Sequence, residues 1–395
     1  MKKSLSFLFF LVSAIPLISQ TFVQRVDFGG YLSEMPSVVF VSNPQEVYWQ
    51  NLVHSRLNFG WQMSGYFRFE ASARTRFLTG SEMMINTDEI GADKGVVDLS
   101  WNVFPNKRVF PNEKFATLNV ALDRLNASFE KGKISLKIGR QRINWGQNFV
   151  WNPNDVFNTY SFFDFDYAER PGCDAFHGTY YHSATSQTEI AASVNTLLTV
   201  SAQKYERKIT AAARRRLNWK NFDFQMIGGM FQQSDLVLGG AWTGDMKGVS
   251  FRGEFSVFQP FQHFADTTAT VAASVGFDYT FANSLFLQAE MLYNNVHDTN
   301  YDGILGLYAA PLSAKTLSIS DWNIFAQANY PFSPRLNGSL SGMYFVDIKA
   351  IYTGFSLDFS VLENLDLSLI SQYFYAAEPL KMHAVFGFAR LKYSF

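Results

Sequence analysis

The sequence predicts an all-β fold, a single antiparallel transmembrane β-barrel of about 16 to 18 strands. Three observations lead to this prediction. Apolar and polar residues alternate with a period of two in many segments long enough to cross a bilayer as tilted strands. The composition is 47% hydrophobic and 17% aromatic, yet the mean hydropathy is −0.05, so the apolar residues are dispersed and not gathered into spanning helices. The chain also ends on an alternating strand.

Residues 1–19 have the pattern of a secretory signal peptide. Two lysines precede an apolar run from Leu5 to Ile18, and Ser19 supplies a small residue at its end. We therefore expect a signal peptide at 1–19 and the barrel at 20–395. The one cysteine, Cys173, has no partner for an internal disulfide.

Alternation defines the predicted strands. From Phe67 to Phe77, apolar or small side chains alternate with three arginines, a glutamate and a serine. A face this polar does not fit a dry core, so it requires a wet lumen. The same pattern predicts eighteen strands, at 25–34, 52–63, 66–80, 116–130, 133–146, 173–183, 186–198, 207–218, 222–233, 235–244, 248–259, 268–282, 284–297, 318–332, 335–348, 350–361, 364–376 and 384–395.

Two predicted strands change phase. In 116–130 the apolar series that includes Leu122 continues one position out of step at Leu125, and in 133–146 the phase changes around Gly139. An extra residue in one strand, a β-bulge, would explain either change.

The predicted connections fall into two groups. Every second gap is tight, beginning with 63–66 and 130–133, whereas the long gaps 35–51, 81–115, 147–172 and 298–317 all fall between them. Short periplasmic turns and long outer loops are the rule in outer-membrane barrels. We therefore expect all long loops on one side.

The segment after Ile138 carries a family resemblance. It reads Gly-Arg-Gln-x-x-x-Trp-Gly from Gly139, then Pro-x-Asp ending at Asp155, then Arg-Pro-Gly from Arg170. This segment, about 140–174, resembles porin-like families of the Gram-negative outer membrane, including anion-selective porins and polysaccharide-export channels. The last strand, Val385 to Phe395, resembles the closing strand of such barrels, whose terminal Phe is the signal for the assembly machinery.

Basic residues are expected to line the lumen and its constriction. Arg140, Arg142 and Asn144 share one parity and would form a column along the wall, facing acidic residues such as Asp155 on an inward-folded loop 147–172. An alternative is that Arg140, Asp155 and Arg170 only fix this loop through ion pairs. The further inward basic residues are Arg56, Arg68, Arg74, Arg76, Arg214 and Arg216.

Aromatic residues are expected at the edges of the lipid-facing band. Trp145, Trp151, Tyr393 and Phe395 are assigned to this girdle, where rings with one polar edge meet both hydrocarbon and water.

No enzyme motif is evident. The six histidines have no metal-ligand spacing, and there is no Gly-x-Ser-x-Gly and no phosphate-binding glycine loop. We therefore expect no catalytic residues, no metal and no cofactor. A net charge of −1 gives no reason to expect nucleic acid.

The resulting expectation is a cell outer-membrane channel for passive diffusion of small polar solutes, with anions favoured because basic residues concentrate in the first half of the chain. Two alternatives stay open: an export or assembly channel for a surface polysaccharide, and a closed structural barrel whose lumen is filled by inward aromatic side chains. The expected partners are outer-membrane lipid and lipopolysaccharide, the barrel-assembly machinery through Phe395, and a small-molecule solute. The sequence does not determine the oligomeric state.

Overall fold

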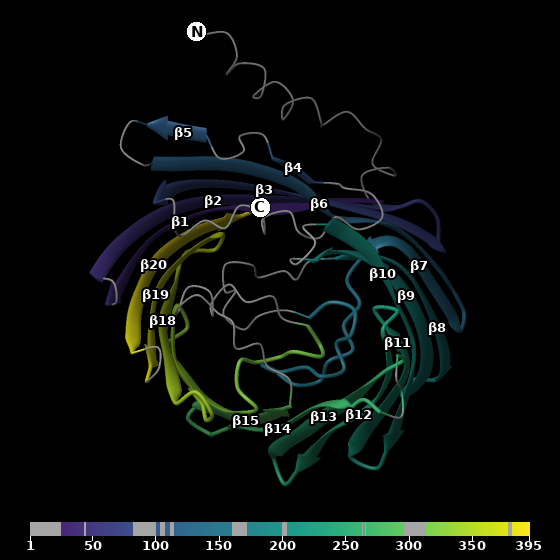
Figure 1. The fold of residues 1–395 in the computed structure, drawn as a ribbon. Coiled ribbons are helices and arrows are strands. Elements are labelled where there is room, and N and C mark those ends of the chain that lie inside the picture. The colour runs from purple at the N-terminus through teal and green to yellow at the C-terminus, as the bar shows by residue number, and fades with distance from the viewer. Residues whose placement is uncertain are drawn as a thin grey trace.

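The computed structural model of the chain describes residues 25–42, 45–81, 100–102, 107–110, 114–159, 172–199, 204–262, 264, 266–295, 313–377 and 381–395. These residues form one antiparallel sheet that closes on itself, because the first strand, β1, pairs with the last, β20. Figure 1 looks into the ring and shows β1 beside β20. The predicted signal peptide at 1–19 lies outside the described residues.

The strands are β1 (Val26–Ser42), β2 (Gln45–Gln62), β3 (Phe67–Ser81), β4 (Ser100–Asn102), β5 (Lys107–Phe110), β6 (Lys114–Lys131), β7 (Ile134–Gln141), β8 (Cys173–Ser183), β9 (Ser186–Thr199), β10 (Lys204–Trp219), β11 (Phe222–Phe231), β12 (Asp235–Met246), β13 (Val249–Pro260), β14 (Thr270–Thr280), β15 (Phe286–Asn294), β16 (Trp322–Ser333), β17 (Leu336–Phe345), β18 (Ala350–Leu362), β19 (Leu365–Ala376) and β20 (Met382–Ser394).

Eighteen of these strands close the ring. The two others, β4 and β5, are short and pair only with β6, on the part of its edge that β7 does not reach. The predicted all-β barrel and its strand number are therefore confirmed, and β4 and β5 are additions that the sequence pattern did not predict.

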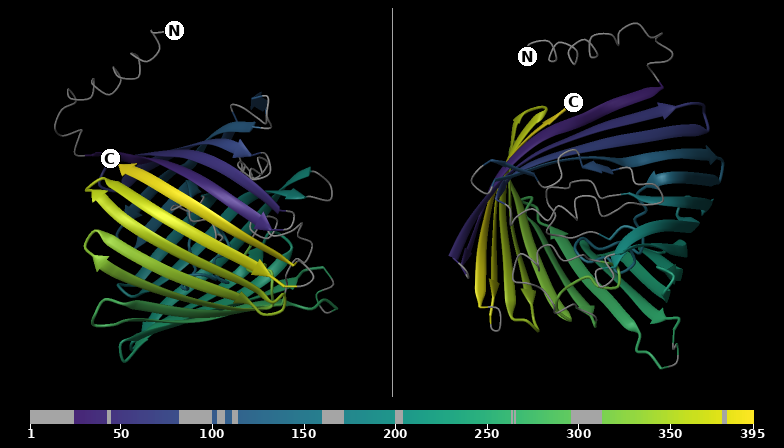
Figure 2. Two further views of the ribbon diagram at one scale, coloured as in Figure 1. Left: turned by 90° about the vertical axis from the view of Figure 1, so that its left-hand side faces the viewer. Right: turned by 45° about the horizontal axis from the view of Figure 1, so that its top comes forward.

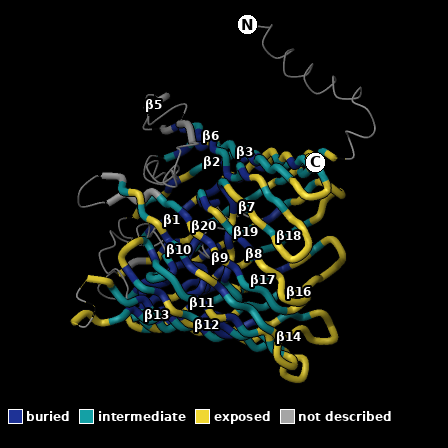
Figure 3. Tube along the Cα trace, turned by 90° about the vertical axis from the view of Figure 1, so that its right-hand side faces the viewer, coloured by how far each residue is buried: buried dark blue, intermediate teal, exposed yellow. Residues whose placement is uncertain are grey.

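Alternation places apolar side chains outside and mostly polar ones inside. On β20, Leu391, Tyr393 and Phe395 are exposed on the outer face, whereas Phe386 is buried in the interior. Figure 3 shows buried and exposed positions side by side around the wall. In a bilayer the exposed apolar side chains would meet hydrocarbon, which is why so many large apolar residues remain uncovered by protein.

The connections have the predicted asymmetry. The eight gaps that begin after β2, β6, β8, β10, β12, β14, β16 and β18 are short, and the C-terminus lies on the same side; we call this the turn side. The other end, the loop side, carries the long connections after β3, β7 and β15. Figure 2 shows the tilted strands from two directions.

One predicted long loop is wrong. Residues 35–51 are mostly strand, because β1 continues to Ser42 and β2 begins at Gln45. Pro36 fits within β1 because it lies where the β1 to β20 ladder has a gap, so no pairing with β20 is lost. The alternation also fades here, since Val39 and Val41 point inward to an apolar cluster.

The two phase changes have different causes. In β6 the predicted bulge is confirmed: Ser72 pairs with Arg124 and Ala73 with Leu122, which leaves Asp123 as the extra residue. In β7 the pairing continues without a shift through Gly139. Gly139 has φ +112°, and the phase changes because the strand ends at Gln141 and the chain leaves the wall.

Candidate functional site: a segment held inside the barrel

After Gln141 the chain enters the lumen. Residues 142–159 form no helix or strand, yet most of their side chains are buried, including Ile143, Asn154 and Val156. Their partners are inward side chains of β9 to β15. We call residues 142–159 the inserted segment; Figure 1 shows it inside the ring.

Two wall carboxylates bind the backbone of the inserted segment. Glu254 on β13 and Glu290 on β15 are both buried, and each accepts hydrogen bonds from three backbone N–H groups. Backbone that leaves a sheet needs such partners, and an ionised carboxylate accepts several hydrogen bonds at once. The donors to Glu254 are Gln147, Asn148 (2.6 Å) and Asn154 (3.1 Å), and those to Glu290 are Phe149 (3.3 Å), Val150 (3.1 Å) and Trp151 (2.7 Å).

The predicted place of Trp145 in the lipid-facing girdle is wrong. Trp145 is fully buried in the lumen, where its Nε1 donates to Glu189 on β9 at 3.1 Å. The Arg214 guanidinium lies 5.2 Å from the centre of its ring and also bonds Glu189, and Phe157 meets the ring edge on. Trp145 is inside because the chain has already left the wall four residues before it.

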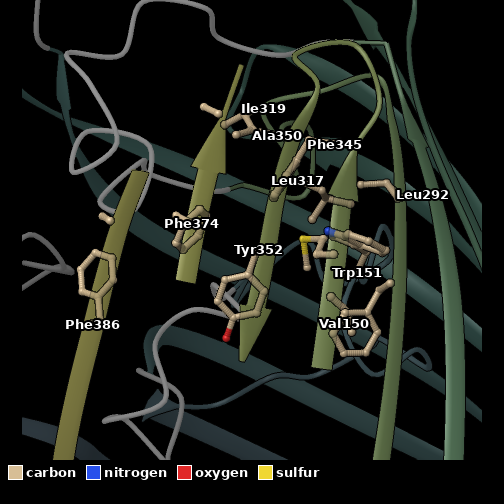
Figure 4. Close-up of a cluster of buried hydrophobic side chains, with 14 of the residues drawn as sticks. Val150, Trp151, Leu292, Leu317, Ile319, Phe345, Ala350, Tyr352, Phe374 and Phe386 are labelled. Carbon is tan, nitrogen blue, oxygen red and sulfur yellow. The ribbon is translucent and has the colours of Figure 1, made fainter. Parts of the chain in front are cut away.

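Trp151 is also inside, not in the girdle. Its ring packs edge on against Phe325 of β16, within an apolar cluster formed by the inserted segment and inward residues of β14 to β20, β1 and β2. Figure 4 shows Val150 and Trp151 near Tyr352, and Phe374 and Phe386 on the next strands. This cluster fills part of the lumen with apolar side chains, so the inner wall is not uniformly polar.

Tyr393 and Phe395 lie on the outer face at the turn side. Both are about half exposed, and Phe395 packs near Phe28 of β1. The backbone of Phe395 exchanges two hydrogen bonds with Gly30, so the last residue completes the closing seam.

On the wall of β2, β3 and β6, Asp123 organises two predicted lumen arginines. Its carboxylate accepts from Arg56 at 2.7 Å and lies 3.4 Å from Arg74. Arg56 also donates to Asn58. Asp123 is the bulged residue of β6, so the bulge supplies the acid between the two arginines. Arg76 lies on the same inner face of β3, opposite His54 of β2.

A basic cavity lies below this cluster, toward the turn side. Its volume is about 470 Å³. Arg68 bridges Asp27 and Glu70, and Lys137 of β7 also contacts Glu70 at 2.9 Å. The charged side chains that line it are four cations, Arg68, Arg124, Lys137 and Arg142, and two acids, Asp27 and Glu70.

The predicted column of Arg140, Arg142 and Asn144 does not form along one strand. Arg140 is the next-to-last residue of β7, within the wall, and forms a two-pronged ion pair with Asp174 of β8, at 2.7 and 3.1 Å. Arg142 and Asn144 belong to the inserted segment and have exposed side chains.

The remaining predicted residues have separate places. Asp155 is fully buried, and its carboxylate accepts from the backbone N–H of Trp145, so it stabilises the fold of the inserted segment. Arg216 lies on the inner face of β10, two residues closer to the turn side than Arg214. Arg170 lies outside the described residues.

Sequence reasoning missed the function of Glu254 and Glu290. Alternation places both acids on the inner faces of their strands. Glu290 is the one acid on β15 and has apolar neighbours, whereas Glu254 has Arg252 two residues before it on the same face of β13. Both carboxylates bind backbone N–H groups of the inserted segment, and the sequence pattern does not reveal such a contact.

Two features are absent from the described residues. No helix there has both the length and the apolar character needed to cross a membrane. No group of three or more His, Cys, Asp or Glu in that part of the chain is placed to hold a metal ion.

The fold is similar to that of several solved structures. The chain is similar to Acinetobacter baumannii OccAB4 (TM-score 0.60, 10% identity, covering 94% of this chain and 99% of that one) and to Pseudomonas aeruginosa OccK7, or OpdD (0.59, 10%, 94% and 98%). It is also similar to Pseudomonas aeruginosa OpdK, solved with vanillate (0.56, 10%, 93% and 99%). No family model and no curated protein matches the sequence. The likeness is therefore one of fold alone, that of a closed antiparallel β-barrel.

Proposed function

We propose that this chain is an outer-membrane channel through which small polar solutes, preferentially anions, diffuse passively. The observation that carries the proposal is the pairing of an inserted segment that narrows the lumen with a basic cavity beside it, in which cations outnumber acids four to two. A water-filled lumen lowers the cost of moving a charged solute past hydrocarbon, and the excess of positive side chains attracts anions.

The acids of the opposite wall support this assignment. Glu254 and Glu290 hold backbone N–H groups of the inserted segment, and Glu189 holds Arg214 and Trp145. These carboxylates are therefore engaged on the β9 to β15 side. The net positive sector is the one near β2, β3, β6 and β7, where Arg142 reaches the cavity.

Planar-bilayer recording of the purified chain tests the proposal. In a potassium chloride gradient, the reversal potential should show chloride preference. The double variant Lys137→Gln with Arg142→Gln should shift the reversal potential toward cation preference, because it removes two of the four cavity cations. A matched control, Lys349→Gln on a loop-side turn, should leave it unchanged. Absence of conductance, or preference for potassium in the unaltered chain, would contradict the proposal.

The apolar cluster around Trp151 favours one alternative, a closed structural barrel. It fills the lumen between the inserted segment and β16 to β20. The same planar-bilayer recording distinguishes an open channel from a closed barrel, because a closed barrel would give no steps of current at any voltage. For an export channel of a surface polysaccharide, the described residues offer no specific support.

Targeting and assembly belong to the same proposal. We expect removal of residues 1–19 during secretion, and recognition of the last strand, through Phe395, by the barrel-assembly machinery. The exposed row formed by Leu391, Tyr393 and Phe395 on the outer face supports this, because it is available before the barrel inserts. Outer-membrane lipid and lipopolysaccharide would then surround the barrel.

A further inference from the structure

An acidic side chain lies in the middle of the outer face of β1. Glu34 is exposed, on the same face as Phe28 six residues before it and Phe40 six residues after it, both of which are exposed aromatic residues. Its carboxylate accepts a hydrogen bond from the side-chain amide of Asn51 on β2 at 3.0 Å. Glu34 is thus midway between the two edges of the apolar band, where an acid facing hydrocarbon is unfavourable.

Glu34 belongs to a polar outer face on neighbouring strands. Alternation places polar residues near the middle of the outer side of β1, β2 and β3, including Glu34, Asn51, Ser55, Thr75 and Thr79. The opposite wall differs. The outward residues at the middle of β14 to β17 are apolar or glycine, for example Val275, Met291, Ala326 and Gly342. The middle of the outer face is therefore more polar on β1 to β3 than on β14 to β17.

Lipid does not offer the hydrogen-bond donors that the Glu34 carboxylate needs. A carboxylate has room for about four hydrogen bonds, and the described contacts give Glu34 one donor, Asn51. Hydrocarbon at this depth has no donors. An anionic lipid headgroup is not suited either, because no outward residue on the described parts of β1, β2, β3 and β20 is Lys or Arg.

We infer that this face, centred on Glu34 and Asn51, is where two copies of the chain contact each other within the membrane. A second copy brings amide and hydroxyl groups that can donate hydrogen bonds to the Glu34 carboxylate. A symmetric interface needs donors and acceptors on the same face, and this face carries both. The neighbouring strand β20 presents Gly387 and Ala389 on its outer side, which lets another barrel wall approach closely. Figure 2 shows β1 and β20 side by side on the outside of the barrel.

Cysteine cross-linking in native outer membranes tests the inference. Cys173 is first replaced, giving Cys173→Ala as the background. Ser55→Cys is placed on the proposed contact face, and Ala326→Cys, at similar depth on the opposite wall, is the matched control. With a short membrane-permeant bismaleimide, the Ser55→Cys chain should form products of twice the monomer mass, and the Ala326→Cys chain should remain monomeric.

A second measurement tests whether Glu34 lies in a contact between two copies of the chain or faces lipid. Glu34→Leu should weaken association about tenfold or more, because each contact loses hydrogen bonds to a charged group. Glu34→Gln should retain most of it. Native mass spectrometry in detergent reads the assembly, and the heat-resistant folded barrel on gels confirms that each variant folds.

The inference is overturned if Ser55→Cys gives no cross-linked product, if it matches Ala326→Cys, or if its product has the mass of a different protein. It is also overturned if Glu34→Leu leaves assembly unchanged. These measurements do not involve transport, so failure of the conductance test and failure of the contact are distinguished.

Discussion

Replacing Glu254 by alanine should weaken the attachment of the middle of the inserted segment to the wall. Three backbone N–H groups, those of Gln147, Asn148 and Asn154, lose their shared acceptor. Hydrogen bonds to a charged group contribute about 1.5–3 kcal/mol each. Three would give an upper bound of about 9 kcal/mol, but removing a buried charge also removes its desolvation cost of several kcal/mol. We therefore expect docking of the segment to weaken by about 2–4 kcal/mol, or roughly 30- to 700-fold.

Hydrogen exchange followed by mass spectrometry measures this change directly. Peptides covering 147–154 should exchange faster in Glu254→Ala by up to that factor, and single-channel conductance should rise and become noisier. Glu254→Gln should be intermediate, because its amide oxygen still accepts. The control is Asp358→Asn, an inward acid whose described partners are Ser356 and Ser368 of the wall. Unchanged protection of 147–154 in the alanine variant would refute the assignment of Glu254 as an anchor.

Three further predictions concern stability and assembly. Trp145→Phe keeps a ring beside Arg214 but loses the bond to Glu189, so the free energy of unfolding should fall by about 1–3 kcal/mol, measured by thermal melting in detergent; an unchanged melting temperature would show that the bond does not contribute. Gly139→Ala should cost about 1–3 kcal/mol, because its φ of +112° is strained for alanine and the added methyl would press on the Leu125 carbonyl, whereas Gly228→Ala on the outer face should be nearly neutral; equal melting of both variants would contradict this reasoning. Deleting Phe395 should reduce the heat-resistant folded fraction on gels, since its backbone completes the seam to β1; full folding without it would argue against a recognition function.

The inserted segment explains how one chain can combine a lipid-compatible wall with a selective interior. Strands satisfy their backbone groups with each other, but a segment inside the lumen needs other partners. Glu254 and Glu290 supply them from the wall, and the buried rings of Trp145 and Trp151 anchor the same segment. The remaining space lies toward Arg142 and the basic cavity, where the electrostatics are set by side chains of the first strands.

The sequence by itself determined the wall. Alternation in single strands, the tight gaps between hairpins and the phase change between Leu122 and Leu125 are local features, and a strand in a barrel shows them wherever its partners lie. That is why the number of wall strands, the turn-side connections and the bulge at Asp123 could be predicted. The pattern failed where both faces are apolar, as at Val39 and Val41, because the alternation disappears there.

Only the tertiary structure decided what occupies the interior. Trp151 donates its backbone N–H to Glu290, 139 residues later in the chain, and Trp145 meets Glu189, 44 residues later. Nothing in the local pattern distinguishes a tryptophan that faces lipid from one buried in the lumen, since both environments accept the ring. The choice depends on β7 ending at Gln141 and on the carboxylates that closure of the barrel brings opposite the segment.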